Sequence, residues 1–246
     1  MKSKVYFTRE ITPEAVVKLY HALGVSLPGK VAVKVHSGEK GNQNFLHPEF
    51  WKPMVDEVQG TIVECNTAYG DATTGVRDNT DSHRKLLEEH GWTKYFPVDL
   101  MDAEGPDVIW PIPNGKVLKE NHLGKNIVNY DSMLVLAHFK GHPMGGYGGA
   151  LKRLSIGRAS RAGKALIHSA GATDDRFETW QKHASSCGLP GGHGRCRFQR
   201  GGTFPGQDRL YQCDEESFRG LRLLCGGGGS LHERHRYSGI PGSGGH

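Results

Sequence analysis

Histidines and lysines flank a glycine-rich segment in the middle of the chain. The segment 138–152, HFKGHPMGGYGGALK, carries His138, Lys140, His142 and Lys152 around five glycines. Glycine lets a backbone approach a ligand closely, and N–H groups at the helix start expected after it can bind an anion, with Lys152 adding positive charge. The spacing matches neither a Walker loop nor a dinucleotide-binding fingerprint. The segment predicts an anion or metal site, with a tight glycine turn and solvated histidines as the alternative.

A second polar loop, HSGEKGN, spans residues 36–42 after an apolar strand pattern. His36 is a candidate ligand or general base because imidazole titrates near neutral pH, and Asn42 is a further candidate for ligand binding. The alternative for His36 is a loop histidine that is hydrogen-bonded to the backbone. We expect His36, His138 and His142 to meet at one edge of a sheet.

Two further features have both a chemical and a structural interpretation. Cys65 also follows a strand pattern, where a lone cysteine is more often a small apolar residue than a nucleophile. Residues 160–164, SRAGK, suit a phosphate or carboxylate contact, but a solvated helix end explains them equally well.

The other cysteines form no Cys-x-x-Cys pair and lack the usual zinc spacings, so no metal site is expected from Cys187, Cys196, Cys213 and Cys225.

Hydrophobic patterns indicate the elements that position these loops. Strands are expected over residues 1–8, 31–36, 61–66 and 131–139, and helices over 13–23, 48–58 and 80–90 and from residue 150. Asn114-Gly115 between two partly apolar runs predicts a hairpin. Strands alternating with helices favour an α/β fold, with a mostly parallel sheet flanked by helices and a hairpin insertion. His36, Cys65 and His138 then lie at the carboxyl edge of the sheet, where such folds place their sites.

The composition changes near residue 181. Residues 182–246 hold 16 of the 35 glycines and four of the five cysteines, contain no valine and have one isoleucine, Ile240. A segment so poor in β-branched residues buries too little apolar surface to offset its ordering entropy. We therefore expect an α/β domain over residues 1–181 and a disordered, glycine-rich C-terminal tail over 182–246.

The net charge of +5 is concentrated in the same tail. It carries nine Lys and Arg against five Asp and Glu, which leaves 22 against 21 in residues 1–181. A basic balance often indicates nucleic acid as a partner, but here it belongs to the atypical tail, so no nucleic-acid partner is expected. Without a long apolar run or a signal-type start, we expect a cytoplasmic protein that does not bind membranes.

Several motifs together resemble one known family. VKVHSGEKGN at 33–42, ECNTAY at 64–69, LAHFKGHPMGGYGGALK at 136–152 and SIGRASRAGK at 155–164 are similar to the family named domain of unknown function 362. The resemblance covers residues 1–181. It implies an iron–sulfur protein, since many members carry a ferredoxin-like four-cysteine module, of the 4Fe–4S type, further along the chain. Electron transfer is the expected role in such members.

The tail departs from that family, and a frameshift accounts for the departure. Synonymous codons can be chosen for residues 182–246 so that, one nucleotide later, they encode an amphipathic helix pattern, a β-type VYINV and a cysteine cluster. In that frame the codons of Leu221, Leu223, Leu224 and Leu231 encode cysteine, the usual iron–sulfur ligand. We therefore hypothesise a one-nucleotide frameshift at codons 181–182 and a truncated domain without its cluster ligands. A genuine low-complexity tail is the alternative.

Two functions follow from these observations, and whether the chain is an enzyme stays open between them. The first is a redox protein whose relatives bind an iron–sulfur cluster, here without the cluster and with a redox protein or a small anionic ligand as its partner. The second is a non-redox module whose edge loops hold a metal or an anionic small molecule. Its candidate ligands are His36, Asn42, His138, Lys140, His142 and Lys152.

Overall fold

The computed structural model describes residues 5–70, 75–113, 115, 117–138, 141–142, 146–147, 149–179 and 221–225. The helices are α1 (Pro13–Leu23), α2 (Pro48–Glu57), α3 (Thr80–Glu89), α4 (Trp92–Tyr95), α5 (Ala150–Leu154), α6 (Arg161–His168) and α7 (Arg176–Thr179), with a 3-10 helix over Lys125–Asn129. The strands are β1 (Val31–Lys34), β2 (Thr61–Glu64), β3 (Val98–Leu100), β4 (Val108–Pro111), β5 (Glu120–Leu123), β6 (Ser132–His138), β7 (Gly141–His142), β8 (Gly146–Tyr147) and β9 (Leu221–Cys225).

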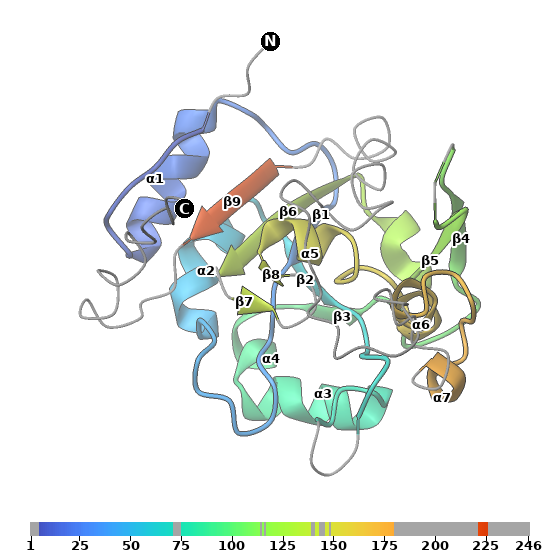
Figure 1. Cartoon of the computed structure of the whole chain (residues 1–246). Helices are drawn as coiled ribbons and strands as arrows, with labels where there is room; N and C mark the ends of the chain where they lie inside the picture. Colours follow the sequence, from blue (N-terminus) through green and yellow to red (C-terminus); the bar gives the residue numbers. More distant parts are fainter. Residues whose placement is uncertain are drawn as a thin grey trace, which may run out of the picture.

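A parallel sheet organises the domain (Figure 1). Its strands lie in the order β3-β2-β1-β6-β9, and each neighbouring pair is parallel. Two antiparallel pairs stand apart from it, β4 with β5 and β7 with β8. The predicted α/β class, with a mostly parallel sheet, flanking helices and a hairpin insertion, is confirmed.

Alternate residues of the central strands build a core on each face of the sheet. Val33 and Leu134 belong to the core that α1, α2 and the buried Trp92 share. Ala32 and Val135 belong to the opposite core, beneath α5 and the 3-10 helix. A parallel sheet buried on both faces needs nearly continuous apolar strands, so a charged residue inside a strand is unusual here.

Local signals in the sequence account for both ends of α1. The Thr12 side chain accepts a hydrogen bond from the backbone N–H of Ala15, and Pro13 occupies the first helical turn of α1. Gly24 ends the helix at a φ of 62°, in the left-handed region that favours glycine. Over the described residues no helix combines the length and apolar composition that crossing a bilayer requires.

The structure differs from the predicted elements at the N-terminus, at one edge of the sheet and in the tail, and it adds α4, α7 and the 3-10 helix, which were not predicted. Residues 5–8 form no strand, and Val5 and Phe7 are exposed. The edge strand β3 was missed because Val98–Leu100 is too short to show a pattern. In the tail, Leu221–Cys225 forms β9 against β6, so these five residues differ from the predicted tail without regular structure. LRLLC is the densest apolar run of the tail, and the edge of β6 offers it backbone hydrogen-bonding groups.

Candidate functional site

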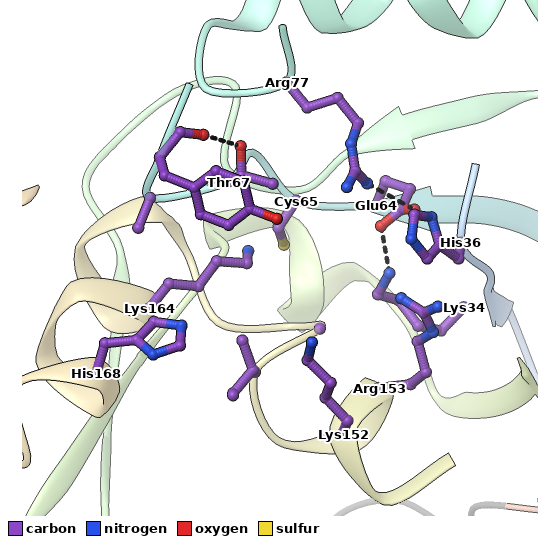
Figure 2. Close-up of a pocket in the computed structure, with 14 residues that line it drawn as sticks. Lys34, His36, Glu64, Cys65, Thr67, Arg77, Lys152, Arg153, Lys164 and His168 are labelled. Carbon is purple, nitrogen blue, oxygen red and sulfur yellow. Dashed lines mark hydrogen bonds and ion pairs between the residues drawn. The ribbon is translucent and has the colours of Figure 1, made fainter. Parts of the chain in front are cut away.

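A basic pocket lies at the carboxyl edge of the sheet, between the ends of β1 and β2 and the helices α5 and α6 (Figure 2). Its volume is about 180 Å³, smaller than the roughly 300–1,000 Å³ of pockets that hold drug-sized ligands. Five lysine and arginine side chains and one carboxylate line it. The lining residues are Lys34, His36, Glu64, Cys65, Thr67, Ala68, Tyr69, Arg77, Lys152, Arg153, Ile156, Gly157, Lys164 and His168.

Glu64, the last residue of β2, organises the charges of the pocket. Its Oε2 accepts a hydrogen bond from Nζ of Lys34 on the neighbouring strand, and its Oε1 accepts the backbone N–H of Ser37 at 2.9 Å. Burial alone would raise the pKa of Glu64, but the positive charges of Lys34 and Arg77 hold it well below its ordinary value. Glu64 is therefore a carboxylate, and burial lowers the pKa of Lys34 although the Glu64 charge opposes that change.

Arg77 joins this pair to the loop after β1. Its Nε donates to Oε2 of Glu39 at 2.8 Å, and its Nη1 lies 3.9 Å from Oε1 of Glu64. Burial would raise the pKa of Glu39, but Arg77 and the backbone N–H of Val76 outweigh it and lower that pKa. The Lys34, Arg77, Glu39 and Glu64 side chains form an ion-pair network that holds the loop 36–42 against the sheet.

Arg153 on α5 brings a guanidinium into the pocket, and two of its nitrogens have no hydrogen-bond acceptor in the described structure. Its side chain is 8% exposed, and its Nε and Nη2 are buried without a hydrogen-bond partner in the described structure. Burial lowers its pKa to about 10, with Glu64 opposing and Arg77 adding to the shift. Buried polar groups are nearly always paired, so two unpaired guanidinium nitrogens indicate a missing acceptor.

Lys152 precedes Arg153 and lines the same pocket (Figure 2). It is partly buried, and among the described residues no acceptor is recorded for its Nζ. Burial first, and then the positive charges of Arg153 and Arg77, lower its pKa to about 8. At pH 7 the side chain is still an ammonium, but it loses its proton more readily than an exposed lysine.

His36, in the loop after β1, also lines the pocket. The backbone N–H of Gly38 donates to its Nδ1 at 3.1 Å, so the neutral imidazole carries its proton on Nε2. The φ of Gly38 is 90°, which permits the turn that brings this N–H back to the ring. The ring of His138, at the end of β6, stacks on that of His36 with 6.0 Å between centroids. The predicted meeting of these two histidines at the sheet edge is thus present.

Cys65 is placed as a core residue. It is 2% exposed, its Sγ donates to the carbonyl of Arg158 at 3.4 Å, and it belongs to one of the two cores. Burial raises the pKa of its thiol, with the Asp102 charge adding to the shift. A thiol that stays protonated is a poor nucleophile and a poor metal ligand, which agrees with the apolar interpretation.

The remaining predicted residues have different outcomes. Asn42 is exposed, does not line the pocket, and accepts the backbone N–H of Asn44 at 2.7 Å through Oδ1. Lys140 and the side chain of His142 lie outside the described residues, although the backbone of His142 belongs to β7. Ligand binding by each of these three residues stays a prediction.

Most of the charged lining is not predicted from the sequence. Its patterns do not indicate Lys34, Glu64, Arg77 and Arg153 as site residues, and for Lys164 they allow either a ligand contact or a solvated helix end. Lys164 is buried and its Nζ donates to the carbonyl of Ala159, so the solvated helix end is wrong for this residue. A lysine inside VAVKV and a glutamate closing TIVE were available signals, because adjacent strands that carry opposite buried charges imply a pair.

A larger hollow of about 640 Å³ runs beside β3, but its central carboxylate is already satisfied. Asp99 accepts hydrogen bonds from Nδ2 of Asn126 and the hydroxyl of Tyr130, each at 2.8 Å. No described group there lacks a partner in the way that Arg153 does. The basic pocket is therefore the stronger candidate site.

The donor set of the described chain does not fit an iron–sulfur cluster or another metal. Such centres are held by several thiolate, imidazole or carboxylate ligands. Within the described ranges, no group of three or more His, Cys, Asp or Glu side chains is placed to hold an ion. The pocket brings together cations, which repel a metal ion and attract an anion.

Comparison with known proteins gives one family and one distant fold match. The model of the family described as Domain of unknown function (DUF362) matches residues 31–205, beyond the boundary predicted at 181. The structure of the lactate racemase apoprotein from Thermoanaerobacterium thermosaccharolyticum matches with a TM-score of 0.42 and 12% identity, over 71% of this chain and 47% of that one. This chain thus spans about half the length of that structure. No curated protein matches the sequence.

Proposed function

We propose that this chain, which belongs to the family described as Domain of unknown function (DUF362), binds a small anionic molecule in the basic pocket at its sheet edge. The observation that carries the proposal is Arg153, whose buried Nε and Nη2 have no acceptor in the described structure. A carboxylate or phosphate oxygen supplies the missing acceptors, and a guanidinium can bind either group in a bidentate manner.

The rest of the lining supports the same ligand chemistry. Lys152 adds a second cation for which no described residue supplies an acceptor, and His36 lines the pocket as a neutral imidazole. The single carboxylate, Glu64, is already engaged by Lys34 and by the N–H of Ser37, so it does not compete for Arg153 by direct hydrogen bonding. The volume of about 180 Å³ suits a small metabolite with one anionic group.

Anion binding is tested with pyruvate and inorganic phosphate as probes. We expect either probe to stabilise the chain, by about 2.7 kcal/mol at a concentration 100 times its Kd, because the ligand binds the folded state alone. Calorimetric titration and thermal unfolding measure the effect. Pyruvamide is the matched neutral probe. Lys85→Met removes an exposed positive charge of α3 that lies outside the pocket, so it controls for the overall charge of the protein. Equal stabilisation by pyruvate and pyruvamide would contradict the proposal.

The iron–sulfur function stays a prediction for relatives with an intact cysteine module. On the frameshift hypothesis the ligand codons of this chain lie out of frame, so we expect no stoichiometric cluster after anaerobic reconstitution. Iron and sulfide analysis measures this, and the nucleotide sequence across codons 175–190 tests the frameshift. A stoichiometric cluster in the 246-residue chain, or codons that do not permit the shifted frame, would refute the corresponding hypothesis.

A further inference from the structure

We propose that Lys152 is a reactive amine that forms an imine with a 2-oxo acid bound in the basic pocket. The inference rests on the proposed anion binding, and it names the substrate class: a carboxylate with a carbonyl group on the adjacent carbon. Arg153 binds the carboxylate, and Nζ of Lys152 attacks the carbonyl carbon. Both side chains extend from α5 into the same space (Figure 2).

Three lysines line the pocket, and their contacts distinguish them. Nζ of Lys34 donates to Glu64 and to the carbonyl of Val35 at 2.8 Å. Nζ of Lys164 donates to the carbonyl of Ala159. Nζ of Lys152 has no recorded acceptor among the described residues. An amine held by hydrogen bonds to a carboxylate or a carbonyl is fixed as a donor, so Lys152 is the pocket lysine able to react.

The surroundings of Lys152 also favour the neutral amine that such a reaction needs. Burial and the charges of Arg153 and Arg77 lower its pKa to about 8. At pH 8 roughly half of such a side chain is neutral, against about 0.4% of an ordinary lysine. Desolvation and neighbouring cations are the usual means by which a lysine becomes nucleophilic.

The chemistry balances without an external oxidant or reductant. The neutral Nζ adds its electron pair to the carbonyl carbon, and one of its protons passes to the carbonyl oxygen to give a carbinolamine that keeps one N–H. Loss of that hydroxyl as water leaves a C=N bond in place of the C=O bond. Hydrolysis reverses both steps, so the imine is a reversible intermediate that a hydride donor converts to a stable secondary amine.

Reductive trapping tests the inference on the full chain. Pyruvate and cyanoborohydride are expected to leave a carboxyethyl group on Lys152, located by peptide mass mapping. Labelling should rise as the pH rises through about 8, and pyruvamide should label Lys152 more slowly because it lacks the carboxylate. Lys152→Arg keeps the charge and removes the reaction, while exposed Lys85 reports background labelling in the same sample.

The outcomes separate this inference from the proposed function. Preferential labelling of Lys152 over Lys85 and Lys164 that is lost in Lys152→Arg, with the variant still folded in urea unfolding, supports the imine. Pyruvate binding without labelling above that of Lys85 overturns the imine and leaves anion binding intact. Absence of binding of both pyruvate and phosphate overturns both. Equal labelling of Lys152, Lys164 and Lys85 indicates random modification and also overturns the imine.

Discussion

Replacement of Glu64 by glutamine is expected to lower the free energy of unfolding by about 3–5 kcal/mol, the typical cost of removing one partner from a buried ion pair. Glu64 is 3% exposed and Lys34 is fully buried, so the variant leaves an uncompensated cation inside the protein. Arg77 and Arg153 lose the same negative neighbour. Urea unfolding at pH 7 measures the change.

The pH dependence gives an independent check on this assignment. Because the pKa of Glu64 is below its ordinary value of 4.5 in the fold, its contribution is complete above about pH 4.5 and is lost as the pH falls through the folded pKa. The difference in the free energy of unfolding between wild type and Glu64→Gln should therefore be constant near neutral pH and should become smaller in acid. A difference in the free energy of unfolding of less than about 1 kcal/mol at pH 7 would show that the buried pair does not stabilise the fold.

A double variant distinguishes the loss of the ion pair from a general effect of removing a charge. The double variant Lys34→Met, Glu64→Leu removes both charges and should recover most of the lost stability, because apolar residues of similar volume often replace a buried pair at little cost. Glu39→Gln is the matched single control. Glu39 is 20% exposed and also binds Arg77, so its loss should cost less than that of Glu64.

Replacement of Arg153 by methionine is expected to have two opposite effects. The free energy of unfolding should rise by about 1–3 kcal/mol, because burial lowers the pKa of Arg153 from 12.5 to about 10 and each unit corresponds to about 1.4 kcal/mol against the charged form. Pyruvate or phosphate affinity should fall about tenfold to hundredfold, the effect of losing a hydrogen bond to a charged group. Urea unfolding and calorimetric titration measure the two effects.

This combination distinguishes a binding residue from a structural one. Arg84→Met, on a side chain that is 57% exposed on α3, should change neither quantity. If Arg153→Met instead lowers stability and leaves anion affinity unchanged, Arg153 has a structural role and the proposed function loses its main support. A rise in stability together with a loss of anion affinity identifies a positive charge that destabilises the fold and binds the ligand.

Much of the fold was predictable because its signals are local. The Thr12-Pro13 start and the Gly24 end define α1 through capping chemistry, and the apolar run of β6 fits a strand that is buried on both faces. The Asn114-Gly115 pair predicted the hairpin that β4 and β5 form. The placement of His36 and His138 at one edge follows from the parallel pairing of β1 and β6, and the stacking of their rings is a further observation of the structure.

The charged lining was not predictable in the same way because it depends on non-local pairing. Lys34 appears as the polar position of an alternating strand, and its burial becomes understandable only when β2 brings Glu64 beside it. Arg153 resembles any exposed helix residue, and only the burial of α5 against the sheet deprives its guanidinium of partners. Residues 5–8, the described part of the strand expected over 1–8, form no strand because their apolar side chains, Val5 and Phe7 among them, are exposed and contact no core.

The pairing of β1 with β6 has a practical consequence for any assay of this protein. The two strands meet across a long stretch of chain, as the bond from the Lys30 N–H to the Asp131 carboxylate shows across 101 residues. The pocket draws on both halves, with Lys34 on one side and Arg153 on the other. No short peptide contains the whole pocket. The number of anion sites per chain measured in a titration therefore equals the fraction of molecules that have reached the native topology.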